Sequence, residues 1–339
     1  MKIKTIISAV FIALITISAG WSQETNKFKT FDQLDTLAMN LIDADSAGQA
    51  IDLLIMHRDQ FPAKDFEISS WVANLCVDNG DHDKAMAIWE DGHQKGYFYL
   101  LNPRMPRYKA LESDERFKNI CDNDSQLRRE ALKDSKTIYQ AIMPGGFLPD
   151  KKYPMLIVLH GGGSTIERAQ KNWKSDKLSN ECITVFIQSY LHYDTKTFGW
   201  RGSDTTARND IQNIYNELIA KYPVDTDRVI IGGISAGGFM AFDIMANNVI
   251  PIKGVLGVCP GKPRELDSTM AAGSNDRGVR VFMVAGETDF YTDRQKEMAN
   301  IFDAVGLPYE YHIVEGLGHD YPDNFESWID RGIEYIFNA

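Results

Sequence analysis

The chain has 339 residues, enough for two domains of about 150 residues each. Hydrophobic residues make up 44% and charged residues 24%, a composition typical of packed globular proteins that excludes a disordered or collagen-like chain. The formal net charge of −11 removes the electrostatic basis for nucleic-acid binding.

The N-terminus has the pattern of a secretory signal peptide. Two lysines precede an apolar run from Thr5 to Gly20, and Ser22 adds a second small residue before the expected cleavage site. We therefore predict a signal peptide over residues 1–22 and export to a periplasm or out of the cell. The alternative is a membrane anchor, but the run is shorter than the ~20 residues that span a bilayer.

The four cysteines bear on this prediction, because disulfides persist in exported proteins. No CxxC pair occurs, which argues against a zinc ribbon or a redox motif. We expect buried free thiols, and a Cys76–Cys121 bridge remains the alternative.

Residues 28–133 have the apolar spacing of helices. Ala38 and Ala50 are separated by the same interval as Ala73 and Ala85, and the two sets are offset along the chain. Small residues at such positions let two helices of a hairpin approach closely. The repeat predicts two consecutive helical hairpins.

With Pro62 at the usual closing position, these hairpins resemble a pair of tetratricopeptide repeats, although the second copy has Tyr97 there. The resemblance implies a helical domain over residues 23–133 that could bind a protein partner. Two repeats are fewer than the three or more usually needed for independent stability. We therefore expect this domain to need contacts with the rest of the chain for its stability. The alternative to partner binding is a purely structural role as a cap.

From residue 134 onward, short β-rich runs alternate with helical ones. This alternation predicts an α/β domain over residues 134–339, with a doubly wound, mostly parallel sheet covered on both faces. The loop over residues 144–154 reads as a hairpin connection between the first two strands. The expected strands cover residues 137–143, 154–160, 183–188, 228–233, 253–259, 279–286 and 309–316, and the expected helices cover 204–221, 236–247, 293–305 and 324–337.

The segment "GGISAGG" contains a G-x-S-x-G motif centred on Ser235, between an expected strand and an expected helix. In that context the serine lies on a tight turn above the carboxyl edge of the sheet, and its hydroxyl is exposed as a nucleophile. The alternative is an ordinary strand-to-helix turn in which the serine only caps the helix.

A serine hydroxyl needs a base and an orienting acid at the same edge of the sheet. Asp289 follows the strand "VRVFMVAG", and His319 follows the last strand. Glu287 and Asp293 are rival acids near Asp289. His312 is a rival base, but it lies inside the last expected strand.

The segment "LHGGGS" at residues 159–164 ends the second strand of this domain. Backbone N–H groups of Gly161 or Gly162, together with that of Ala236, would stabilise a developing oxyanion. We expect His160 to be structural, and His57, His82 and His93 of the helical half to be solvated or hydrogen-bonded.

These motifs, in this order, resemble those of secreted α/β-hydrolase esterases, in the group of polyester depolymerases and feruloyl esterases. They are also similar to the catalytic modules of prolyl oligopeptidases. The resemblance covers residues 134–339 and implies ester hydrolysis through an acyl-enzyme, with Ser235 as nucleophile, His319 as base and Asp289 as the acid that orients it. A serine peptidase or a protein-binding scaffold remains the alternative.

The substrate is not identified by these motifs. Tyr190 and Trp200 lie in an aromatic-rich segment after a strand, and we expect them to line an acyl or aromatic pocket for a small-molecule or polymeric ester. We expect no cofactor, because no HExxH, P-loop or clean G-x-G-x-x-G motif occurs.

Overall fold

The computed structural model describes residues 28–338, so the predicted signal peptide lies outside the described residues. The chain divides into two compact units, Met1–Asp65 and Phe66–Ala339. Within residues 28–338, no helix is both long and apolar enough to cross a membrane.

The first unit contains a helical hairpin. Helix α1 is capped by Thr30, whose hydroxyl accepts a hydrogen bond from the N–H of Gln33 at 3.4 Å. It packs against α2, and Ala38 and Ala50 are both fully buried, as expected of small residues at a close helix contact. The unit contains α1 (Phe31–Asp43), α2 (Ala47–His57) and the 3₁₀ turns η1 (Arg58–Gln60) and η2 (Pro62–Lys64).

The second unit begins with further helices. Ala73 and Ala85 are fully buried, like their counterparts in the first unit, and Trp89 is also buried. The repeat pattern therefore coincides with buried positions, while the tetratricopeptide assignment and the boundary after residue 133 stay predictions. The elements are α3 (Asp65–Asp78), α4 (His82–Gln94), the 3₁₀ helix η3 (Pro106–Leu111) and α5 (Glu115–Asp134).

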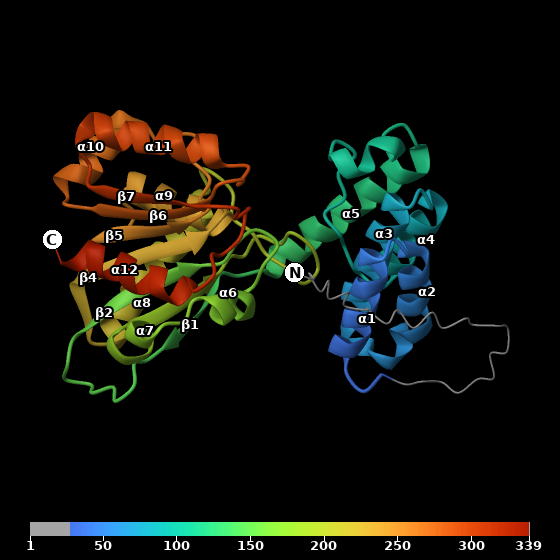
Figure 1. Ribbon diagram of the computed structural model, residues 1–339, viewed down its shortest axis with the longest axis horizontal. Helices are drawn as coiled ribbons and strands as arrows, with labels where there is room; N and C mark the ends of the chain where they lie inside the picture. Colours follow the sequence, from blue (N-terminus) through green and yellow to red (C-terminus); the bar gives the residue numbers. More distant parts are fainter. Residues whose placement is uncertain (1–27, 339) are drawn as a thin grey trace, which may run out of the picture. The chain divides into compact units, whose positions relative to one another are not determined.

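A seven-stranded sheet follows (Figure 1). We call this sheet and the helices α6–α12 that flank it the α/β region. The strand order is β1-β3-β2-β4-β5-β6-β7, and every pair is parallel except β1 with β3. Each strand lies where the sequence predicts one. The strands are β1 (Ile138–Ile142), β2 (Tyr153–Leu159), β3 (Ile183–Gln188), β4 (Val224–Ile234), β5 (Gly254–Val258), β6 (Arg280–Gly286) and β7 (Tyr309–Val314).

The predicted hairpin between the first two strands is wrong. β3 lies between β1 and β2, so the loop over residues 144–154 passes over a strand instead of turning back beside its own. The run of turn-forming residues indicated a loop, but which strands lie beside each other depends on pairing partners distant in sequence.

Both faces of the sheet are buried under helices. Met155, Ile157 and Leu159 point to the face covered by α8, α9, α10 and α11, whereas Leu156 and Val158 point to the face covered by α6, α7 and α12. Alternate residues of one strand therefore enter two separate cores, which is why the strands read as continuous apolar runs.

Local signals fix the ends of several helices. The carboxylate of Asp204 accepts from the N–H of Ala207 and caps α8, which ends at Lys221 just before Pro223. Helix α11 ends at Gly306 in the left-handed conformation, with φ 65°. These helices match the predicted ranges. They are α8 (Thr205–Lys221), α9 (Ala236–Ala246), α11 (Thr292–Val305) and α12 (Phe325–Phe337).

Three helices of the α/β region have no counterpart in the sequence prediction. The first two are too short to display a helical period, and the third lies in a polar stretch. They are α6 (Ile166–Asn172), α7 (Asp176–Glu181) and α10 (Ser268–Asp276).

The chain reverses its direction of winding between β2 and β4. From β2 the chain proceeds to β3 on one side, and it then returns to place β4 on the other. In open parallel sheets, ligands bind beyond the carboxyl ends of the strands at such a point.

Candidate active site

Ser235 lies between β4 and α9 in a conformation that few non-glycine residues adopt. Its φ is 55° and its ψ is −116°. A Cβ on Gly233 would come within 2.5 Å of the carbonyl oxygen of Leu159, and one on Gly237 within 2.2 Å of the same oxygen. The close approach of β2 therefore requires both glycines of the motif. The resulting turn, with its strained backbone, places the serine at the edge of the sheet.

Asp289 and His319 are brought together from the loops after β6 and β7. His319 Nδ1 lies 2.8 Å from Asp289 Oδ1. Asp289 also accepts hydrogen bonds from the N–H of Tyr291 at 2.9 Å and from Gln295 Nε2 at 2.7 Å. Burial raises the pKa of this carboxyl, but the bonds from Tyr291, Gln295 and His319 outweigh it and lower the pKa below its usual value. The acid is therefore held ionised.

The loop that carries His319 is tied to the end of β6. A Cβ on Gly286 would lie 2.1 Å from the carbonyl oxygen of Gly318, so only glycine permits this approach. The N–H of Thr288 donates to the carbonyl of Leu317 at 3.0 Å. Phe290 packs on the His319 ring, with centroids 4.1 Å apart. The imidazole is thus positioned by the loop and by stacking as well as by Asp289.

Ser235 and His319 line the same cavity, which has a volume of about 380 Å³. In the described residues no hydrogen bond joins the Ser235 hydroxyl to the imidazole, a contact that is often long before substrate binds. His319 Nε2 is the ring nitrogen left for this role, because Nδ1 bonds Asp289. The residues lining the cavity are Gly161, Gly162, Gly163, Ser164, Arg168, Lys171, Asn172, Ile234, Ser235, His319 and Tyr321.

The rival acids and the rival base have other positions. Glu287 accepts from the N–H of Gly316 at 3.0 Å, and Asp293 is exposed in the first turn of α11. His312 lies within β7, 2.7 Å from Glu310. The structure pairs none of them with His319 or Ser235.

Gly161, which follows β2 and His160, is held in place by the His160 ring. Its Nδ1 donates to the carbonyl oxygen of Gly161 at 2.7 Å, and its Nε2 accepts from the N–H of Ser189 at 3.2 Å. Burial lowers the pKa of His160 to about 4, so the ring is neutral at neutral pH. His160 therefore has the structural role that the sequence suggested.

Gly161 and Gly162 line the cavity beside Ser235, and Ala236 is the first residue of α9. The first N–H groups of a helix have no intrahelical acceptor. The N–H of Ala236 is thus available next to the serine. The sequence predicts an oxyanion hole at Gly161, Gly162 and Ala236, and that role stays a prediction.

Tyr190 and Trp200 do not line this cavity, so the expectation that they would form a substrate pocket here is wrong. Trp200 is buried, and its Nε1 donates to the carbonyl oxygen of His160 at 3.0 Å. The hydroxyl of Tyr190 donates to the carboxylate of Asp204. Both aromatic rings therefore support the framework, because their polar atoms have partners inside the protein.

Tyr193, in the same segment, is an aromatic residue that the sequence reasoning missed. Its ring lies about 3.1 Å from the position that a Cβ on Gly162 would occupy, and burial raises its pKa. Its loop is bonded to the segment after α4, because Thr195 Oγ1 accepts from the N–H of Phe98 at 2.7 Å and donates to the Phe98 carbonyl at 3.1 Å. The spacing of residues gave no signal for this long-range contact.

Cys259, at the end of β5, is a second residue that the sequence did not single out. Its φ is 43°, and its thiol lies 3.4 Å from the carbonyl oxygen of Asp320 in the His319 loop. Burial raises the thiol pKa to about 12. Ligand atoms of Cys259, Asp289 and His319 lie within 4.8 Å of one another, but a protonated thiol and a bonded His–Asp pair do not favour a metal.

Cys121, Cys182 and Cys259 are buried free thiols. Since Cys121 is free, the Cys76–Cys121 bridge is not formed.

Comparison with known proteins supports the fold more firmly than the activity. No protein-family profile matches the chain. A protein named "Probable dipeptidyl-aminopeptidase B" from Uncinocarpus reesii is 27% identical over 221 residues, which are 52% of this chain but only 23% of that protein. The chain thus spans about a quarter of the length of this relative.

Among solved structures, an uncharacterized protein from Bacillus cereus ATCC 10987 is 21% identical and has a TM-score of 0.52, with 91% of this chain and 99% of that chain covered. A ferulic acid esterase is 20% identical with a TM-score of 0.47, covering 62% of this chain and 94% of the other. The mostly parallel seven-stranded sheet with flanking helices matches the α/β-hydrolase fold.

Proposed function

We propose that this chain is an exported serine hydrolase that cleaves carboxylic esters through an acyl-enzyme. The observation that carries the proposal is that His319, hydrogen-bonded to the buried Asp289, lines one glycine-rich cavity with Ser235, whose backbone is strained. These are the parts of a nucleophilic hydrolase: a nucleophile, a base and an orienting acid.

In the first half of the proposed reaction, Ser235 Oγ attacks the ester carbonyl carbon and its proton passes to His319 Nε2. The carbonyl electron pair moves to oxygen, and the oxyanion accepts hydrogen bonds from the N–H groups of Ala236 and of Gly161 or Gly162. Collapse of this intermediate breaks the bond to the alcohol, which leaves with the proton from His319.

In the second half, His319 takes a proton from water while the water oxygen attacks the acyl carbon. The bond to Ser235 then breaks, and the serine recovers its proton from His319. Throughout both halves Asp289 remains ionised, because its hydrogen bonds lower its pKa, and it keeps the imidazole in the required tautomer.

A fluorophosphonate probe tests the nucleophile directly, because it reacts with activated serines. We expect labelling of the wild type and of Ser164→Ala, which changes another serine of the same cavity, and no labelling of Ser235→Ala. Equal labelling of Ser235→Ala, or none of the wild type, would refute the proposal.

A peptidase is the second candidate, favoured by the relative whose name indicates a dipeptidyl-aminopeptidase. The cavity argues for an ester instead, because it contains Arg168 and Lys171 and no carboxylate in its lining to hold a peptide ammonium group. Rates on p-nitrophenyl esters and on dipeptide p-nitroanilides decide between the two, and faster anilide cleavage would reverse the assignment.

Export is part of the proposal and rests on the sequence of residues 1–22. N-terminal sequencing of the protein from a periplasmic or culture fraction should begin at Gln23. An intact Met1 on membrane-bound protein would indicate the anchor instead.

A further inference from the structure

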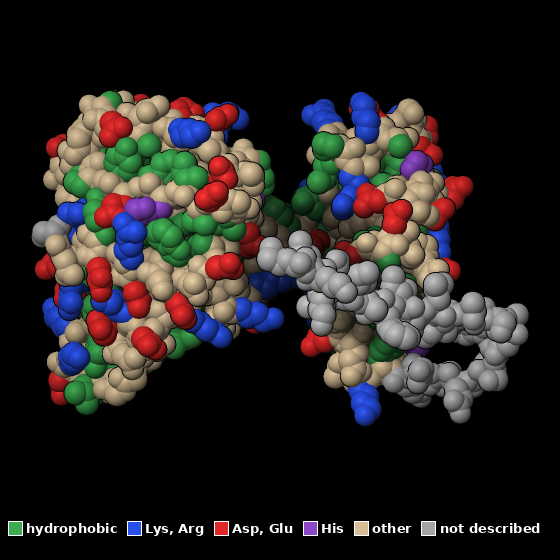
Figure 2. All heavy atoms as spheres, in the orientation of Figure 1, with side chains coloured by type: hydrophobic (Ala, Val, Ile, Leu, Met, Phe, Trp, Pro, Cys, Tyr) green, Lys and Arg blue, Asp and Glu red, His purple; other side chains and the backbone are tan. Residues whose placement is uncertain are grey.

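The cavity that contains Ser235 has only positively charged side chains among its Lys, Arg, Asp and Glu residues, although the chain has a net negative charge. The chain has 47 acidic and 36 basic residues. The cavity lining nevertheless includes two cations, Arg168 and Lys171, and no Asp or Glu. In the view of Figure 2, Lys and Arg are interspersed with Asp and Glu over the α/β region.

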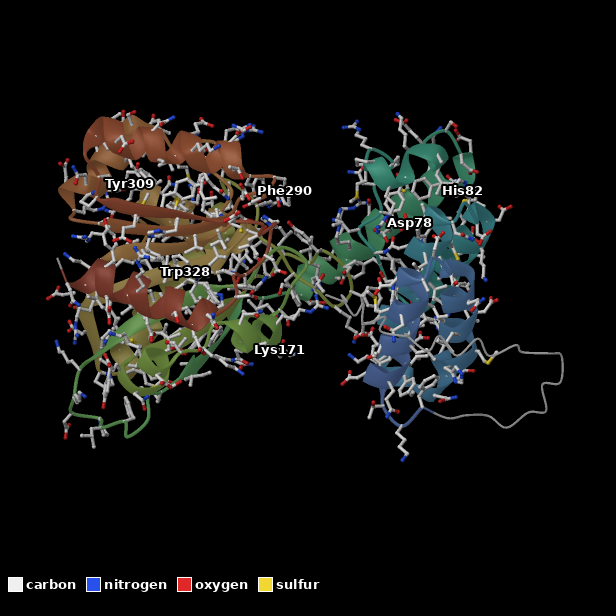
Figure 3. The ribbon with its side chains drawn as sticks, in the orientation of Figure 1. Asp78, His82, Lys171, Phe290, Tyr309 and Trp328 are labelled. Carbon is white, nitrogen blue, oxygen red and sulfur yellow. The ribbon has the colours of Figure 1, made fainter. Side chains whose placement is uncertain are left out.

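Lys171 is the less satisfied of the two cations. It is exposed on α6 and makes no hydrogen bond or ion pair with residues 28–338. Figure 3 shows it at the same end of the α/β region as Phe290, which packs on His319. By contrast, Lys177 on the next helix is paired with Glu334 at 2.7 Å.

The expected partner of Lys171 is engaged elsewhere. Glu167 is four residues earlier on the same helix, the spacing at which Glu and Lys commonly pair. No ion pair joins Glu167 to Lys171 within residues 28–338, and the pKa of Glu167 is lowered chiefly by the Thr165 hydroxyl. The lysine is consequently left available to the cavity.

Arg168 lies against the segment that carries the oxyanion donors. One guanidinium nitrogen, Nη1, donates to the carbonyl oxygen of Gly163 at 3.0 Å. A guanidinium has five N–H donors, so most of them remain for a ligand. Asn172, on the same helix, adds an amide to the lining.

We propose that this cavity selects esters that carry a carboxylate a few atoms from the reacting carbonyl, with Lys171 and Arg168 as the residues that bind the carboxylate. The inference rests on the proposed function and narrows its substrate class. A bound carboxylate would neutralise two cations that the protein leaves without an acidic partner in the cavity lining, and its attraction to them would add to substrate binding.

The test compares two esters with the same nitrophenyl leaving group and acyl chain, one with a free carboxylate and one with that carboxylate methylated: mono-4-nitrophenyl glutarate and methyl 4-nitrophenyl glutarate. We expect wild-type kcat/KM to be about tenfold higher for the anionic ester in low salt, and the preference to shrink in 0.5 M NaCl because salt screens the attraction.

Variants that reverse or remove these charges locate the effect. In Lys171→Glu the ratio of kcat/KM for the anionic over the neutral ester should fall about tenfold or more, and Arg168→Gln should lower it less. Lys174→Glu is the matched control, since it makes the same charge change on an exposed residue outside this cavity lining. Its ratio should stay within twofold of the wild type.

The outcomes separate the two proposals. If the wild type hydrolyses both esters equally, or if Lys171→Glu keeps the wild-type ratio, the anionic substrate class is refuted while ester hydrolysis stands. If neither ester is cleaved and Ser235 is not labelled by the fluorophosphonate, the proposed function itself fails.

Discussion

Residues 28–338 contain two histidine–aspartate pairs joined by a side-chain hydrogen bond, one in the α/β region and one among the helices before it. His319 lies 2.8 Å from Asp289, and His93 Nε2 lies 3.2 Å from Asp124. Each pair lies beside a cavity, of about 380 Å³ for His319 and about 600 Å³ for His93. Cavity size therefore does not distinguish a reactive pair from a structural one.

The pairs differ in what remains free on the imidazole. The second nitrogen of His93 lies 3.1 Å from the amide of Asn123, and the side chain is only 3% exposed. The second nitrogen of His319 has no hydrogen-bond partner in the described chain, the side chain is 20% exposed, and it shares its cavity with Ser235. The comparison teaches that a histidine–aspartate pair can act as a base only where one ring nitrogen faces an open cavity and a nucleophile.

The carboxylates differ in the same way. Asp124 is fully buried and accepts from the N–H groups of Tyr99 at 2.6 Å and Leu101 at 3.1 Å, so it holds a backbone segment in place. Asp289 holds an imidazole.

The largest expected effect is that of Asp289→Asn. The amide favours the wrong tautomer of His319, and we expect kcat to fall about ten-thousand-fold, the size seen when the orienting acid of a Ser-His-Asp triad is changed to its amide. The free energy of unfolding should change much less. Ester kinetics and urea unfolding measure the two effects, and retention of more than a tenth of the activity would remove Asp289 from the mechanism.

The converse is expected of Asp124→Asn. The new NH₂ group would face donors that now bond the carboxylate, and we expect a loss of about 3 kcal/mol in the free energy of unfolding. The kcat of the folded fraction should stay within about threefold of wild type. Urea titration with parallel ester assays checks this. A large loss of kcat at unchanged stability would show that the His93–Asp124 pair also takes part in the reaction.

His160 sharpens the comparison as a buried histidine without a carboxylate partner. Its folded pKa of about 4 lies below the usual 6.5, so only the unfolded chain binds this proton between those values. The contribution of His160 to the free energy of unfolding is fully present above pH 6.5. It is lost as the pH falls toward 4, by roughly 3 kcal/mol at 1.36 kcal/mol per pKa unit. His160→Gln should therefore show a smaller loss of unfolding free energy than wild type over that interval. Urea titrations from pH 7 to 4 measure this. The same dependence of unfolding free energy on pH in both proteins would contradict the prediction.

The smallest effect is expected at the contact between the loop that contains Tyr193 and the segment after α4. Thr195→Val removes both hydrogen bonds between Oγ1 and Phe98, each worth about 1 kcal/mol, and should loosen Tyr193 beside Gly162. We expect KM to rise about fivefold with little change in kcat. Thr195→Ser keeps the hydroxyl and should behave as wild type. Identical KM values for the two variants would show that this contact does not reach the cavity.

Much of the α/β region was predictable because its signals are local. Short β-rich runs marked all seven strands, and the glycines around Ser235 marked the turn that the approach of β2 requires. The placement of β1 beside β3, the burial of Trp200 and the position of Tyr193 were not predictable, because each depends on contacts between residues far apart in sequence.

The sequence by itself determined the order of the elements, the strained serine turn and the residue types at the strand ends, because hydrophobic periodicity and glycine requirements act over a few residues. Only the tertiary structure decided that Asp289, and neither Glu287 nor Asp293, bonds His319. It also decided that Lys171 and Arg168 share the cavity of Ser235. Those outcomes depend on which loops meet at the carboxyl edge of the sheet, and the folding of the whole α/β region sets that meeting.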